Sequence, residues 1–303
     1  MKQNKIKWAG NILALAALWF LIDFFRKLQI DFQILCSAKM LAGVCAGTIL
    51  SFASVLLSAW AWKNTAAFFA EEQIPFRAAA KVYLQANLGK YLPGNIVHFV
   101  ERSLFASKAG IGHTETVIGT FLEIAGLVFA AVFFGMILSF QDVCAIVRTF
   151  FSVPYAVGIT GLLMIGMAVL WMLYKKLAWV RILCKKIKQA AFLRMVCLNL
   201  LLYLAALFLL AVLMCLLVGL LNGTAPTLPQ ARMIMSVYVL SWAAGFVIPG
   251  APGGIGVREL VITYLSRNHP IQEVMLLAMV VHRICTVFGD IFAYLYAKSG
   301  LLL

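Results

Sequence analysis

The sequence predicts an all-α protein that crosses a membrane several times and forms one transmembrane domain over residues 1–303. Of its 303 residues, 64% are hydrophobic and only 12% are charged, whereas a soluble domain has about 25% charged residues. Six apolar segments approach the roughly 20 residues that a helix needs to cross a bilayer, so we expect six full spans. In chain order they are 8–25, 40–62, 116–138, 155–174, 195–221 and 274–297.

The distribution of positive charge predicts the orientation of the chain. The formal net charge is +14, which in a soluble protein would suggest a nucleic-acid partner. Much of the positive charge lies in short loops between apolar segments, so the positive-inside rule explains it and we expect no nucleic acid to bind. Segment 175–194 carries seven lysines and arginines and no acidic residue, and segment 1–7 carries three lysines. We therefore expect both segments, and the N-terminus, to be cytoplasmic.

The residue types that build metal and catalytic centres are present without the necessary spacing. The seven cysteines form no close pair, and the four histidines have no metal-ligand spacing. There is no G-x-S-x-G nucleophile motif. We therefore expect no metal, no cofactor and no catalytic residue.

Pro-Gly motifs interrupt two of the apolar regions and predict hairpins of two partial helices. The first hairpin is expected at 76–107, around Leu-Pro-Gly at 92–94, and the second at 231–266, around Ile-Pro-Gly at 248–250. Proline cannot continue a helix, and irregular backbone at membrane depth requires surrounding protein or a water-filled cavity. We expect re-entrant or broken-helix hairpins. The alternative for the first, more polar one is a helix pair at the membrane interface.

The similarity of the two motifs predicts an internal repeat, with halves at 1–154 and 155–303. In both motifs an aliphatic residue precedes Pro-Gly, and an arginine follows the proline by nine positions, at Arg102 and Arg258. The predicted topology places the motifs on opposite sides of the membrane. Transporters built as inverted repeats hold their substrates at such discontinuous helices. The alternative is a coincidence between two common turn sequences.

The glycine-rich second motif predicts a site for an anion. A helix that begins after Pro-Gly directs free N–H groups and the positive end of its dipole towards the break. Gly253 and Gly254 would allow a headgroup to approach those amides. Arg258 would add a guanidinium group, whose donors match the oxygens of a phosphate.

The first motif offers a weaker counterpart of this site. Arg102 would take the place of Arg258, and Asn95 would cap the helix that follows the break. Alternatively, both arginines anchor helix ends at the interface by extending towards water, or they pair with the adjacent carboxylates of Glu101 and Glu259.

Ionisable residues inside two predicted spans complete the candidate site. Glu123 lies in the third span, where a carboxylate costs roughly 2.5 kcal/mol or more. It therefore needs a partner, for which Arg102, Arg258 and Arg283 are the candidates. Arg283 and Asp290, seven residues apart in the last span, share a helix face. These groups form either a static buried network or a proton-linked relay.

The run Pro-Gly-Ala-Pro-Gly-Gly-Ile-Gly-Val-Arg-Glu-Leu at 249–260 resembles the lysylphosphatidylglycerol synthase transmembrane-region family. This family is also described as the flippase domain of the multiple peptide resistance factor. Segment 89–94, Arg102, Glu123 and Arg283 are similar to that family as well. The resemblance implies an eight-segment domain in a bacterial-type plasma membrane, which moves a phospholipid such as aminoacylated phosphatidylglycerol between leaflets and contributes to antimicrobial peptide resistance.

Two departures from the family pattern limit what the resemblance implies. Fused relatives carry an aminoacyltransferase domain after the membrane part, whereas this chain stops at residue 303, so we do not expect the synthase activity. Relatives often have glycine and an acidic residue where this chain has Asn-Ile-Val-His at 95–98. Stand-alone members are therefore expected to serve other anionic or polyprenyl-linked lipids.

Taken together, these patterns predict a lipid translocase that binds an anionic headgroup in a polar cavity between the hairpins; a homo-oligomer is left open. The first alternative is a non-transporting membrane partner of a lipid-modifying enzyme or glycosyltransferase, which docks through segment 175–194. The second is a membrane enzyme that uses Glu123 and His282 as acid and base.

Overall fold

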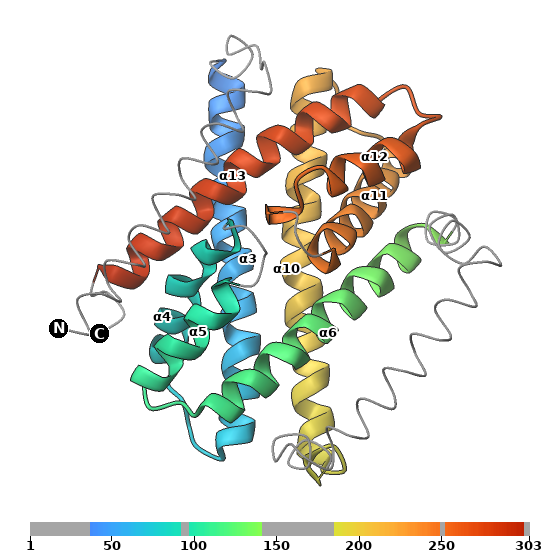
Figure 1. Cartoon of the computed structure of the whole chain (residues 1–303). Coiled ribbons are helices and arrows are strands. Elements are labelled where there is room, and N and C mark those ends of the chain that lie inside the picture. The colour runs from blue at the N-terminus through green and yellow to red at the C-terminus, as the bar shows by residue number, and fades with distance from the viewer. Residues whose placement is uncertain (1–36, 92–96, 141–184, 249–251, 300–303) are drawn as a thin grey trace.

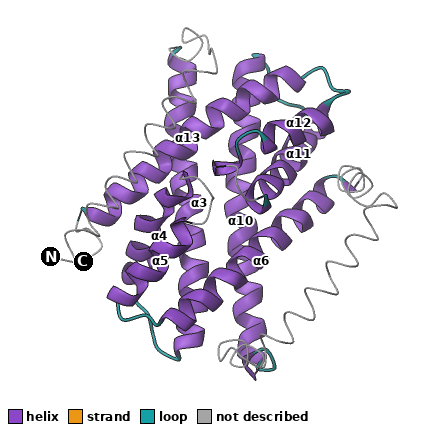
Figure 2. Ribbon diagram, viewed as in Figure 1, coloured by secondary structure: helices purple, strands orange, loops and turns teal. Residues whose placement is uncertain are grey.

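The computed structural model describes residues 37–91, 97–140, 185–248 and 252–299, which are almost entirely helical and contain no strand (Figures 1 and 2). Within these ranges, four helices are long and apolar enough to cross a membrane. They are α3 (Ala38–Ala70), α6 (His113–Leu138), α10 (Ala190–Asn222) and α13 (Gln272–Lys298). The prediction of an all-helical protein with several helices able to span a membrane is thereby confirmed, while the count of six spans and the re-entrant hairpins stay predictions. The predicted spans 8–25 and 155–174 lie outside the described residues.

The two regions with Pro-Gly motifs each form a pair of shorter helices around the motif. In chain order their elements are α4 (Phe76–Ala86), the 3-10 turn η1 (Asn87–Tyr91) and α5 (Val97–Lys108), then α11 (Leu228–Val247), the 3-10 turn η2 (Pro252–Gly254) and α12 (Val257–Ser266). Residues 92–96 and 249–251 of the motifs lie outside the described part. Regular helix thus ends before each Pro-Gly motif, as proline requires.

The two halves of the chain pack their helices in the same pattern. If α3 is exchanged with α10, α4 with α11, α5 with α12 and α6 with α13, each of the stronger contacts between these eight helices falls on another observed contact or, for α3 with α10, on itself. For example, α4 packs on α13 as α11 packs on α6. In Figure 1, α3 and α10 run antiparallel through the centre, and the two short-helix pairs lie near their opposite ends.

Small residues allow α3 to approach its neighbours closely. A Cβ atom on Gly43 would lie 2.5 Å from Leu220 of α10, and one on Gly47 would lie 2.7 Å from both Leu213 of α10 and Cys285 of α13. Close approach of this kind replaces the hydrophobic driving force that is absent between helices in lipid. Gly43 and Gly47 therefore pack α3 against its neighbours.

The end of α3 is capped by a lysine from a distant segment. Lys186 Nζ donates hydrogen bonds to the carbonyl oxygens of Phe68 and Phe69, at 3.1 Å each, and lies 2.9 Å from Glu71 Oε1. A cation near the last carbonyls of a helix is favourable because the C-terminal end carries partial negative charge. Lys186 therefore ties the segment before α10 to the end of α3.

We expect Lys186→Met to lower the thermal stability of the detergent-solubilised protein, by about 1–2 kcal/mol in the free energy of unfolding. The hydrogen bond from Lys186 lowers the pKa of Glu71, so the ion pair contributes above the ordinary pKa of glutamate and is lost as pH falls through the lowered value. The matched control is Lys188→Met, which changes an exposed lysine two residues away. Equal unfolding temperatures for the two variants would contradict the capping role.

Candidate functional site

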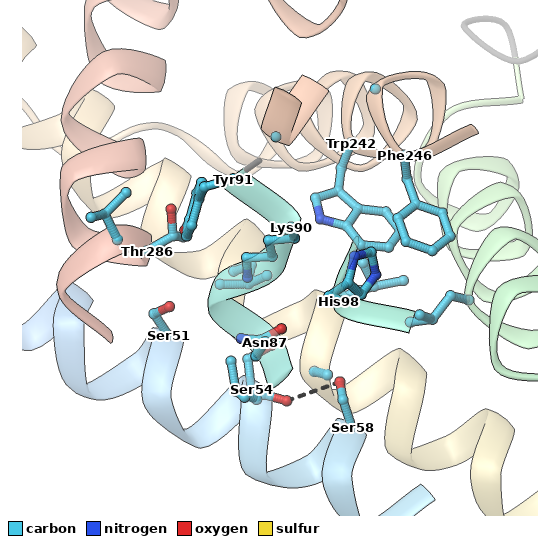
Figure 3. A pocket seen from close by; sticks show the side chains of 18 of the residues that line it. Ser51, Ser54, Ser58, Asn87, Lys90, Tyr91, His98, Trp242, Phe246 and Thr286 are labelled. Carbon is cyan, nitrogen blue, oxygen red and sulfur yellow. Dashed lines mark hydrogen bonds between the residues drawn. The ribbon is translucent and has the colours of Figure 1, made fainter. Parts of the chain in front are cut away.

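A cavity of about 150 Å³ lies between the two halves of the protein (Figure 3). Each of the eight described α-helices and both 3-10 turns contribute residues to its wall. On one side are Ser51, Ser54 and Ser58 of α3, and across the cavity in this view are Trp242 and Phe246 of α11. These serines of α3 thus line the cavity, whereas Gly43 and Gly47 of the same helix pack against neighbouring helices.

The first charged group of the cavity is a buried ion pair between α5 and α6. Arg102 and Glu123, whose side chains are 1% and 3% exposed, form a salt bridge. Tyr83 Oη donates a hydrogen bond to Glu123 Oε1 at 2.6 Å, and the guanidinium carbon of Arg102 lies 4.0 Å from the centre of the Tyr83 ring. Of the three candidate partners for Glu123, the structure selects Arg102. The guanidinium of Arg102 is already neutralised by a protein carboxylate.

The second charged group joins η1 of the first half to α13 of the second half. Asp290 is completely buried and lies 2.7 Å from Lys90 Nζ. Asn87 Nδ2 donates to the same carboxylate at 2.6 Å, and the Tyr91 hydroxyl also donates to it. Although Asp290 shares a helix face with Arg283, its partner is Lys90.

The third charged group links α12 to α13. Arg283 Nη2 lies 2.8 Å from Glu259 Oε1 and donates a hydrogen bond to the carbonyl oxygen of Gly254 at 3.2 Å. Glu259 Oε2 also accepts a hydrogen bond from the backbone N–H of Gly256 at 2.9 Å. Glu259 therefore closes the first turn of α12 and neutralises Arg283 at the same time.

Arg258 differs from the other cations of the cavity. It lines the wall, but it forms no hydrogen bond or ion pair with another described residue, and its Nε atom is buried without a hydrogen-bond partner. The neighbouring carboxylate of Glu259 is directed to Arg283 instead. Within the described ranges, Arg258 is thus the cavity-lining arginine or lysine without a carboxylate partner.

Two glycines hold the side chain of Arg258 in place. A Cβ atom on Gly254 would lie 2.8 Å from Arg258 Nε and 2.9 Å from the Cα atom of Gly245. One on Gly245 would lie 2.8 Å from Arg258 Cγ and 3.1 Å from the Cα atom of Gly254. Gly254 also has a φ of +73°, in the left-handed region that favours glycine. The backbones of α11 and the turn before α12 therefore touch beside the arginine.

Five of the eight residues expected at the site line the cavity. They are Arg102, Glu123, Gly253, Arg258 and Arg283. Gly254 and Glu259 lie behind the wall, where they contact Arg258 and Arg283. Asn95 lies outside the described residues. His282, the expected acid–base partner of Glu123, is completely buried, with Nε2 3.2 Å from the Leu210 carbonyl oxygen, and does not line the cavity.

The two arginines follow their prolines at the same spacing but differ in their partners. Arg102 forms an ion pair with Glu123, whereas Arg258 forms none with a described residue. His98 of α5 lines the cavity as well.

Sequence reasoning missed several residues that shape the cavity. Lys90 and Asn87 lie in the 3-10 turn before the first Pro-Gly motif, and Gly245 lies in α11. The three serines of α3 are spaced so that they share one helix face, which could have indicated a polar wall. The partner of Asp290 carried no such signal, since 200 residues separate it from Lys90.

Comparisons of the chain with protein-family models, curated proteins and solved structures found no match. The resemblance carried by the motif at 249–260 therefore stays a prediction.

Glu123→Gln removes the charge that compensates Arg102, and loss of one partner of a buried ion pair costs about 3–5 kcal/mol. We expect a lower unfolding temperature for the detergent-solubilised variant. The double variant Arg102→Met/Glu123→Gln should recover most of this loss, because it leaves no unpaired buried charge. Wild-type stability of the single variant would contradict the assigned pairing.

Gly245→Ala should lower stability by about 1–3 kcal/mol, because the added methyl group overlaps Arg258 and the backbone of Gly254. The control is Gly119→Ala, also in a helix, where the nearest atom to an added Cβ is Trp62 Nε1 at 3.4 Å. The two unfolding temperatures provide the comparison. A larger loss at Gly119 would argue against the close contact at Gly245.

Proposed function

We propose that the protein moves a lipid with an anionic headgroup between the two leaflets of a bacterial-type plasma membrane, and that it is not an enzyme. The observation that carries the proposal is the guanidinium of Arg258, which lines a central cavity without a carboxylate partner among the described residues. A cation in apolar surroundings is costly unless an opposite charge neutralises it. The donors of a guanidinium group match the oxygens of a phosphate.

The size of the cavity fits a headgroup and excludes a whole lipid. A volume of about 150 Å³ can hold on the order of ten water molecules, since one water needs at least about 10–15 Å³ of such space. The acyl chains therefore stay in the bilayer while the headgroup occupies the cavity.

The symmetry of the packing supports a transporter built as an inverted repeat. The helix contacts are preserved when the halves are exchanged, and α3 and α10 run antiparallel. If these two helices cross the membrane, the short-helix pairs at their opposite ends face opposite leaflets. Substrates of such transporters bind at the interface of the repeats, which is where the cavity lies.

The short helices expose apolar side chains, as expected for hairpins that enter the membrane. Val100 and Leu104 of α5 are 54% and 45% exposed, and Leu260 of α12 is 69% exposed. Large apolar groups on helices too short to span are favourable beside lipid and unfavourable in water. They support two re-entrant hairpins. The proposed architecture combines these hairpins with six full spans and a cytoplasmic N-terminus.

In the proposed mechanism, Arg258 binds the phosphate, while the paired charges fix the positions of the helices that form the cavity wall. Glu123 with Arg102 and Arg283 with Glu259 each fix a short helix to the long helix that follows it. Rocking of one half against the other would open the cavity first to one leaflet and then to the other.

Arg258→Gln should reduce the flux of acyl-labelled phosphatidylglycerol in proteoliposomes at least about tenfold, the effect of losing about 1.4 kcal/mol of headgroup interaction. Flux is measured by the accessibility of the fluorophore to a membrane-impermeant quencher. Arg267→Gln is the matched control, because Arg267 is exposed at the end of the same helix. Wild-type flux in a folded Arg258→Gln variant would contradict the proposal.

A further inference from the structure

The carboxylates around the cavity are all engaged by cations of the protein. Each of the three acidic residues at its wall or directly behind it forms a salt bridge of its own. The pairs are Glu123 with Arg102, Glu259 with Arg283, and Asp290 with Lys90. Glu101, the acidic residue of α5, makes no ion pair with a described residue but does not line the cavity. Among the described residues at the wall or directly behind it, no carboxylate is left to receive an ammonium group of a ligand.

The charge that remains matches a single phosphodiester. After the three pairs are counted, Arg258 contributes one uncompensated positive charge to the wall. A phosphodiester carries one negative charge and so balances it. A lysyl headgroup adds two ammonium groups to the same phosphate, and these would face the like charge of Arg258 without an acceptor. Like charges in a site of low dielectric constant repel each other strongly.

The wall next to these charges is suited to hydroxyl groups. Ser51 and Ser54 are 2% and 5% exposed and line the cavity, and their hydroxyls form no hydrogen bond with another described residue. Ser58 donates to the carbonyl oxygen of Ser54 at 3.1 Å and keeps its acceptor capacity. A serine hydroxyl both donates and accepts, so these groups can bind the hydroxyls of an uncharged headgroup.

The opposite wall adds a flat apolar surface. The rings of Trp242 and Phe246 stack with their centres 5.0 Å apart and their planes 10° from parallel, and both line the cavity. Figure 3 shows them across from the serines, with Lys90 and Asn87 in the space between. The carbon-bound hydrogens of a polyol or sugar pack on an aromatic face, while its hydroxyl groups can reach the serines.

We infer that the cavity selects a lipid phosphodiester with an uncharged, hydroxyl-bearing headgroup, such as glycerol or a sugar, and rejects a lipid with an aminoacyl headgroup. The inference rests on the proposed function, because it names the substrate class of the same site. Arg258 would pair with the negative charge of the phosphate, and the serines of α3 would form hydrogen bonds with the hydroxyl groups. The predicted preference differs from the aminoacylated substrate that the sequence motif at 249–260 implies.

Binding is tested on the full chain in detergent, by thermal stabilisation with three lipids that have the same acyl chains. Phosphatidylglycerol should bind roughly tenfold or more tightly than lysyl-phosphatidylglycerol, and more tightly than phosphatidylmethanol, which has the same charge without the glycerol hydroxyls. Equal or tighter binding of the lysyl lipid would overturn the charge selection. Equal binding of phosphatidylmethanol would overturn the hydroxyl selection.

Two variants and one control distinguish headgroup selection from simple loss of folding. Arg258→Glu should reverse the order of the phosphatidylglycerol and lysyl lipids, a result that a merely structural role of Arg258 would not produce. Arg267→Glu, on the exposed end of α12, should keep the wild-type order. Ser51→Ala/Ser54→Ala should remove the advantage over phosphatidylmethanol and leave the charge preference. An unchanged lipid order in Arg258→Glu would refute the assignment.

Flux of the same lipids in proteoliposomes distinguishes this inference from the proposed function. Selective binding without flux of any of them would retain the inferred headgroup class and refute translocation. Flux of both the phosphatidylglycerol and lysyl lipids at equal rates would retain translocation and refute the selection.

Discussion

Neutralisation of buried charge is the constraint on which this structure depends. A single charge in an apolar interior is costly, whereas a well-placed pair is tolerated and fixes geometry. Each of the three cavity pairs joins a segment next to a Pro-Gly motif to a long helix. They are Arg102 with Glu123, Glu259 with Arg283, and Lys90 with Asp290. The first two pairs occupy corresponding places in the two halves with opposite polarity, since the short helix supplies the cation in one half and the anion in the other. In each half, an ion pair thus joins the short helix to the long helix that follows it, but the residue types are exchanged.

The site arises where the two halves differ. The contacts between the α-helices are symmetric, but η1 packs on α13 without a matching contact between η2 and α6 among the stronger contacts. That extra contact carries the bonds from Asn87, Lys90 and Tyr91 to Asp290. In the second half, Arg258 lines the cavity without an ion pair to a described residue, whereas Arg102 of the first half is paired with Glu123. A symmetric scaffold therefore encloses a cavity with an asymmetric charge.

The sequence predicted the helices better than the contacts between them. Long apolar segments identified the four described spans, because the cost of burying an unsatisfied backbone leaves helix as the local solution. Charges within apolar sequence likewise marked Glu123 and Arg283 as site residues. Their partners depended on tertiary packing: Glu123 had three candidate arginines, and Asp290 pairs with a lysine 200 positions away. The contact of Gly245 with Gly254 was equally hidden, since glycines at such places are also common in turns.

The paired charges that join the helices are separate from the charge of Arg258, which lines the cavity. Arg258 makes no ion pair with the described residues, so the helix-to-helix links do not run through it. Evolution can therefore change the net charge of the cavity with one codon and leave the scaffold energetically intact. Under the proposed function, descendants of one ancestral chain could diverge in substrate without passing through an unstable intermediate. The identity of residue 258 would then be an informative position for sorting such chains by substrate.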